Sequence, residues 1–165
     1  MPIEDALLTI AEIALVFAGF TSLIAVVRGP GRGQWRPIEW IAMWLMVGWS
    51  LAALFFSLLP VLLFHYGVSP AVLWATSSGA LGLFILGFVS VMLRRLRKTQ
   101  AEVMLPRASR VFRVLVPLVF MAQLLAAVDF LVPRGPATYL LGVVALLAFA
   151  VFPFVAFLSL IASED

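Results

Sequence analysis

Two carboxylates lie inside segments that are otherwise apolar, and they are the first candidates for chemistry in this chain. Glu12 lies within the apolar run 3–27, and Asp129 lies near the end of the run 111–132. An ionisable side chain is expensive in a membrane-spanning segment and is typical of an ion pathway or proton relay. We therefore take Glu12 and Asp129 as candidates for a cation or proton site, with His65 as a pH-sensitive group at its mouth.

Neutral polar side chains are expected at a similar depth, where they would line a shallow pocket that opens outward. The predicted lining residues are Thr9, Ser57, Thr76, Ser77, Ser78 and Gln123. Gln123 stands nearer the midplane and needs a hydrogen-bond partner, for which its counterpart in a second copy is one option. The alternative for the carboxylates is structural, with Arg134 paired to Asp129 or Glu12 in an interfacial salt bridge and Glu12 facing water.

Enzymatic chemistry is not indicated. The chain has no cysteine, which excludes disulfides, zinc-thiolate sites, iron–sulfur clusters and thiol catalysis, and one histidine cannot supply a bis-histidine haem site. Metalloprotease, nucleophile-elbow, phosphate-loop and dinucleotide signatures are missing from the sequence. We therefore expect no cofactor, no metal and no catalytic residue.

The elements that carry these side chains are predicted to be membrane helices. Of the 165 residues, 64% are apolar and 12% are charged, against about 45–50% and about 25% in soluble domains. Because a crossing takes about 20 apolar residues, the chain has room for five. The sequence predicts one all-α membrane domain, residues 1–165, with spans at about 3–27, 38–64, 71–93, 111–132 and 137–161.

The distribution of basic residues sets the predicted orientation. The first connection carries three Lys or Arg, the second none, the third seven and the fourth one. The positive-inside rule therefore puts the N-terminus outside and the C-terminus in the cytoplasm. Tyr66, Trp74 and Tyr139 would then lie at the outer interface. Because Glu12 weakens the first span, four spans with an interfacial N-terminal helix remain an alternative.

The third connection, residues 94–113, is a basic cytoplasmic loop that we expect to contact anionic lipid headgroups. A cytoplasmic protein partner is the other option for it, whereas nucleic-acid binding is not expected from so short a segment. The predicted lipid contacts are Arg94, Arg95, Arg97, Lys98, Arg107, Arg110 and Arg113.

Small side chains on the helix faces favour association between copies. Ala11, Ala14, Ala18, Ser22 and Ala25 form one such stripe on the first span, next to a polar stripe of Asp5, Thr9, Glu12, Val16 and Gly19. Close helix approach at small residues is the usual mode of contact in membranes. The sequence thus predicts a homo-oligomeric ion channel or small transporter of the bacterial cytoplasmic membrane. The alternative is a non-transporting scaffold or accessory subunit.

Overall fold

The protein is described from a computed structural model, which covers residues 2–27, 37–99 and 106–162 apart from some side chains near helix ends. Five helices account for the regular structure in these ranges. They are α1 (Pro2–Val27), α2 (Pro37–His65), α3 (Pro70–Thr99), α4 (Pro106–Ala127) and α5 (Pro136–Ala162). Each begins at a proline, a residue favoured at the first helical position because its fixed φ suits the helix and its missing N–H would have no partner there.

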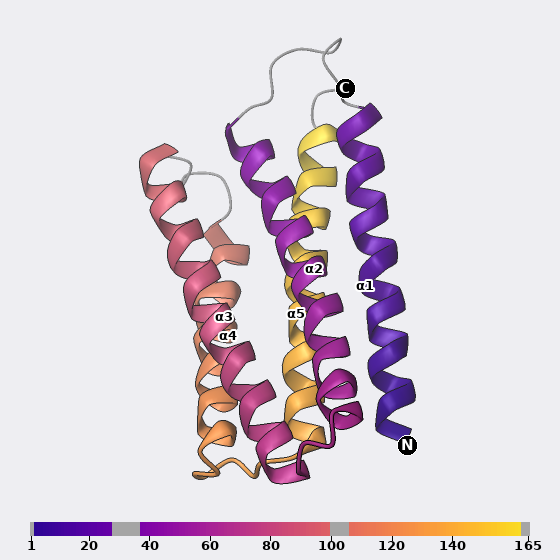
Figure 1. Cartoon of the computed structure of the whole chain (residues 1–165). Coiled ribbons are helices and arrows are strands. Elements are labelled where there is room, and N and C mark those ends of the chain that lie inside the picture. Colours follow the sequence, from indigo (N-terminus) through magenta and orange to yellow (C-terminus); the bar gives the residue numbers. More distant parts are fainter. Residues whose placement is uncertain (1, 28–36, 100–105, 163–165) are drawn as a thin grey trace.

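The helices run up and down beside one another, so that α1 begins at one end of the bundle and α5 ends at the other (Figure 1). α2 packs against α1, α3 and α5, and α3 forms a second close pair with α4. α1 lies along α2 rather than across the end of the bundle (Figure 1).

Four of the helices are long and apolar enough to cross a membrane. The qualifying stretches are Ile3–Ile24, Glu39–His65, Pro70–Arg95 and Pro136–Val155. In α4 the apolar part is the shorter segment Val114–Ala127, about 21 Å at 1.5 Å per residue. The chain is therefore an all-helical protein with the features of an integral membrane protein.

Two helix boundaries differ from the predicted spans. α3 continues to Thr99, because the basic residues after Leu93 are good helix formers and suit the negative end of the helix dipole. α4 begins at Pro106 and ends at Ala127, so the expected loop 94–113 consists largely of helix ends. The predicted fourth span instead continued to residue 132.

The core centres on Trp49 of α2, which is fully buried. Its ring meets aromatic rings from three other helices, and the nearest ring on each lies at 4.7 Å (Phe88 of α3), 5.3 Å (Phe149 of α5) and 6.3 Å (Phe112 of α4). Gly48 makes room for this cluster, since a Cβ there would overlap the Phe88 ring. Large aromatic side chains thus fill the middle of the bundle.

The outer surface of the bundle is apolar on every helix. Leu23 of α1, Phe55 of α2, Leu83 of α3, Leu118 of α4 and Leu141 of α5 are each more than half exposed. Such a surface would promote aggregation of a water-soluble protein, whereas hydrocarbon chains cover it without cost.

Candidate functional site

Glu12 lies on the outside of the bundle. The residue is exposed, as are the other members of the polar stripe, Asp5, Thr9, Val16 and Gly19. It is ten residues from the start of α1, about 15 Å along the helix axis. The Thr9 hydroxyl donates to the Asp5 carbonyl at 2.9 Å, and a Cβ on Gly19 would meet no atom within 4 Å. The stripe therefore forms an uncovered face of α1, with the Glu12 carboxylate in its middle.

The neighbouring small stripe of α1 has a different role. Ala11 is 6% exposed and Ala14 is 0% exposed, both packed into the bundle. These two small residues therefore serve helix contact within the chain, while the polar stripe is left uncovered. Further along the same arc, Ser22 is exposed and its hydroxyl bonds to the Ala18 carbonyl at 3.0 Å.

Asp129 belongs to the turn after α4 rather than to a helix. Its φ is 58°, a conformation in which aspartate is among the better tolerated residues. Its Oδ1 accepts the backbone N–H of Arg134 at 3.0 Å, and the Arg134 guanidinium donates to the Ala127 carbonyl at 3.0 Å. The two residues are linked through the backbone amide, and the guanidinium caps the end of α4. Asp129 thereby acts as a turn-forming residue.

His65 is the last residue of α2 and is exposed. Its Nδ1 lies 2.8 Å from the Val61 carbonyl, which can only accept, so Nδ1 is the donor in this contact. Among the residues that the structure describes, no three His, Asp or Glu side chains are grouped closely enough to hold a metal ion. Glu12, Asp129 and His65 therefore do not form one three-ligand site within a single copy.

The predicted pocket-lining residues fall into two groups. Thr9 and Thr76 are exposed, and each hydroxyl donates to the backbone carbonyl four residues earlier in its own helix. This is a common hydrogen bond of Ser and Thr hydroxyls in membrane helices. Four others are buried inside the bundle: Ser57, Ser77, Ser78 and Gln123. The Gln123 amide nitrogen donates to the Thr138 carbonyl of α5 at 2.9 Å, so its partner lies in the same chain.

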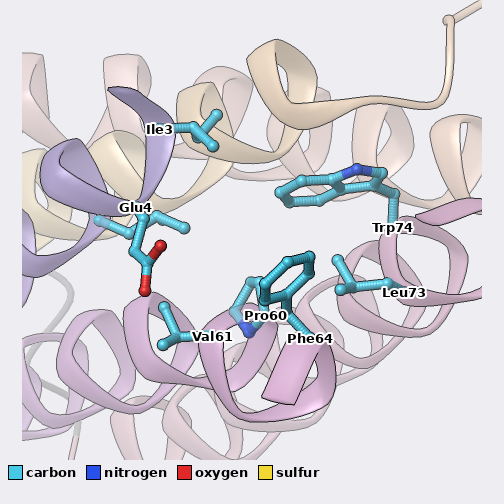
Figure 2. Close-up of a pocket in the computed structure, with 8 residues that line it drawn as sticks. Ile3, Glu4, Pro60, Val61, Phe64, Leu73 and Trp74 are labelled. Atoms are coloured by element: carbon cyan, nitrogen blue, oxygen red, sulfur yellow. The ribbon is translucent and has the colours of Figure 1, made fainter. Parts of the chain in front are cut away.

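A pocket does open near the end of the bundle where α1 begins, but all of its lining residues except Glu4 are apolar (Figure 2). Its cavity volume is about 40 Å³. Glu4 stands at one side of it, and the remaining lining residues are Ile3, Leu7, Pro60, Val61, Phe64, Leu73 and Trp74. None of the predicted polar lining residues belongs to this pocket.

Two of the predicted headgroup contacts can be placed at the opposite end of α3. Arg94 and Arg95 are exposed, and the Arg95 guanidinium carbon lies 5.9 Å from the centre of the Trp44 ring of α2, a cation–π distance. The side chains of the other predicted contacts lie outside the described residues: Arg97, Lys98, Arg107, Arg110 and Arg113.

Sequence reasoning missed the hydrogen bond that joins α5 to α2. Pro60 has no N–H, so the Phe56 carbonyl four residues earlier loses its helical donor. The Tyr139 hydroxyl takes that place at 2.5 Å. Tyr139 is fully buried inside the bundle, a packing role that the sequence did not indicate. The proline inside α2 was the signal for an unpaired carbonyl, although nothing local indicated which residue would pair with it.

A buried carboxylate was missed as well. Glu39 is 3% exposed and lies in the first turn of α2, where the positive end of the helix dipole favours a negative charge. Its position near a helix start was readable from Pro37, but its burial depends on the packing of neighbouring helices.

Comparisons with protein-family models, with curated proteins and with solved structures gave no match.

Proposed function

We propose that several copies of the chain assemble in the membrane into a small cation channel or transporter, with the polar stripe of α1 facing the contact between copies. Each copy crosses the membrane five times, with the N-terminus outside and the C-terminus in the cytoplasm. The orientation is that of a bacterial cytoplasmic membrane protein. Basic residues of 94–113 lie at the cytoplasmic headgroups.

The exposure of Glu12 carries this proposal. Around it on α1, Leu8 is 40% exposed, Leu15 59% and Val16 59%, so a single copy would present the carboxylate to hydrocarbon. A charged side chain near the middle of a membrane helix costs about 2.5–3.5 kcal/mol. Contact between copies removes that cost, because the carboxylate then faces water or a partner helix instead of lipid.

The shape of the stripe supports close contact. Val16 and Gly19 continue the face beyond Glu12, and the open space at Gly19 lets another helix backbone approach. The chemistry favours cations, since Asp5 and Glu12 are both acidic and no basic residue belongs to the stripe. A ring of such carboxylates from several copies is a recurrent cation-selective arrangement.

Cysteine cross-linking tests the assembly directly, because the chain contains no cysteine of its own. We expect Val16→Cys to form a disulfide-linked dimer on oxidation in membranes. Leu83→Cys is the matched control: Leu83 is 64% exposed and lies about 20 Å from the start of α3, while Val16 lies about 21 Å from the start of α1. Equal cross-linking at both positions, or at Leu83 alone, contradicts the assigned face.

Flux through liposomes tests the activity. The parent protein should pass monovalent cations, and Glu12→Gln should lower that flux while leaving Val16→Cys cross-linking unchanged. Absence of cation flux from the parent protein, with cross-linking intact, contradicts a channel.

A scaffold or accessory subunit is the second candidate, and the packing of the bundle favours it. Trp49 and its neighbouring Phe rings fill the middle of the chain, as a subunit without a pathway of its own requires. The polar stripe would then receive a helix of a different protein. In that case the purified Val16→Cys variant forms no dimer, whereas cross-linking in native membranes yields a larger product.

A further inference from the structure

Several polar side chains buried in the bundle have an atom without a hydrogen-bond partner among the described residues. The hydroxyls of Ser77 and Ser78 on α3 and of Ser57 on α2 are among them, and all three residues are 0% exposed. Exposed Ser22 and Thr76 instead donate to the carbonyl four residues back in their own helix. The buried serines do not use this local solution, so their hydroxyls are available for another partner.

The side-chain carbonyl of Gln123 points to what that partner must supply. Gln123 is 2% exposed and its Oε1 has no donor. Its Nε2 donates to the Thr138 carbonyl at 2.9 Å. This bond fixes the orientation of the side-chain amide, because the flipped amide would place Oε1 against the Thr138 oxygen, and both atoms can only accept. A serine hydroxyl can rotate to reach a helix carbonyl, but Oε1 only accepts. It therefore needs a hydroxyl or a bound molecule that donates.

The side chain of Gln123 lies where α3, α4 and α5 meet. A Cβ on Gly142 of α5 would lie 2.7 Å from its Cδ, and a Cβ on Gly82 of α3 would lie 3.6 Å from its Cβ. Ser78 precedes Gly82 by four residues and so shares its face of α3. The hydroxyl of Ser78 is thus one helical turn from the glycine that Gln123 packs against.

Two contacts of Tyr139 connect α2 and α3 in the same region. The Tyr139 hydroxyl binds the carbonyl of Phe56, the residue before Ser57, and the Tyr139 ring lies 5.7 Å from Trp74. Trp74 lies three residues before Ser77 and four before Ser78, on the same side of α3. Tyr139 accordingly borders the polar region on the side nearer the start of α3.

We propose that Gln123, Ser77 and Ser78 hold bound water, forming a buried hydration site inside each copy with Ser57 at its edge. Water both donates and accepts, which meets the need of Oε1 and of the hydroxyls together. Buried waters of this kind bind about three polar groups each, and proteins hold about one per 27 residues. The site is internal to one chain and does not depend on the assembly of copies or on Glu12.

X-ray hydroxyl-radical footprinting of the protein in lipid nanodiscs tests the site, because bound water generates oxidation of the side chains next to it. Tyr139 is 0% exposed and Phe149 of α5 is 4% exposed, and Phe149 serves as the dry control because its side chain has no polar atom to bind water. After correction for the intrinsic reactivity of each side chain, we expect Tyr139 to be oxidised several-fold faster than Phe149, and Ser78→Ala to lower the Tyr139 rate. Equal rates for the two residues in the parent protein overturn the proposal.

The sign of a stability change gives an independent readout. If the Ser78 hydroxyl binds water, Ser78→Ala loses a hydrogen bond and the unfolding midpoint falls by about 2–4 °C. If the hydroxyl has no partner, its removal raises the midpoint, and if it bonds to its own helix the midpoint stays unchanged; either result overturns the proposal. Ser22→Ala, at an exposed serine bonded to its own helix, is the control and should leave the midpoint unchanged. Both readouts are independent of cation flux and cross-linking.

Discussion

Replacement of Tyr139 by phenylalanine is expected to weaken the contact between α5 and α2. The variant keeps the ring that packs 5.7 Å from Trp74 but removes the hydroxyl bound to the Phe56 carbonyl. A buried carbonyl left without a donor costs about 1–3 kcal/mol, and helix–helix hydrogen bonds in membranes measure about 0.6 kcal/mol on average and about 1.7 kcal/mol at most. Because the Phe56 carbonyl has no helical donor to return to, we expect a loss of about 1–2 kcal/mol, or about 2–8 °C in the midpoint of thermal unfolding.

The physical reason is specific to Pro60 and can be tested by a double-mutant cycle. Pro60→Ala returns a backbone N–H that can bond to the Phe56 carbonyl, so the hydroxyl is no longer its sole donor. Tyr139→Phe should then cost less in the Pro60→Ala background than in the parent chain. Thermal unfolding of the four proteins in the same lipid nanodiscs, followed by circular dichroism, measures both costs. An equal cost in both backgrounds would refute the assignment of Tyr139 as the substitute donor.

Two further predictions concern the packing of the bundle. Gly142→Ala places a methyl group 2.7 Å from the Gln123 Cδ and 2.9 Å from the Leu81 Cδ2, and should destabilise the protein by about 1–3 kcal/mol; Gly87→Ala, where nothing lies within 4 Å, is the control and should not lower the thermal midpoint. Trp49→Ala removes the ring shared by four helices and should cost about 3–5 kcal/mol, measured by chemical unfolding; a loss below about 1 kcal/mol would show that the aromatic cluster does not hold the core.

The helices could be predicted because their signals are local. Long apolar runs indicate membrane helices, and prolines such as Pro37, Pro70 and Pro136 stand at the first helical position. The end of α4 could not be predicted in this way. The sequence stays apolar through Val132, and the helix ends earlier because Asp129 and Arg134 build a turn whose bonds span five and seven residues.

The candidate site could be predicted only in part, because spacing along a helix says which residues share a face but not what that face meets. Asp5, Thr9 and Glu12 were predicted to share a stripe of α1, and they do lie on one exposed face. The packing of α1 against the bundle then decides that Ala14 is inside and Glu12 outside. The partner of Gln123 is likewise set by tertiary structure, since only the placement of α5 brings the Thr138 carbonyl within reach.

The placement of polar and aromatic groups bears on where a substrate would pass. Inside the chain, the hydroxyls of Ser77 and Ser78 are separated from the other end of the bundle by Trp49 and the rings of Phe84 and Phe88. A continuous polar path through one copy would therefore require these rings to move. The face around Glu12 has no such obstruction, because it is open along α1 from Asp5 to Gly19. Passage between copies thus needs no repacking of the core, whereas passage through a copy does, and Trp49→Ala should leave cation flux intact wherever the destabilised protein still cross-links through Val16→Cys.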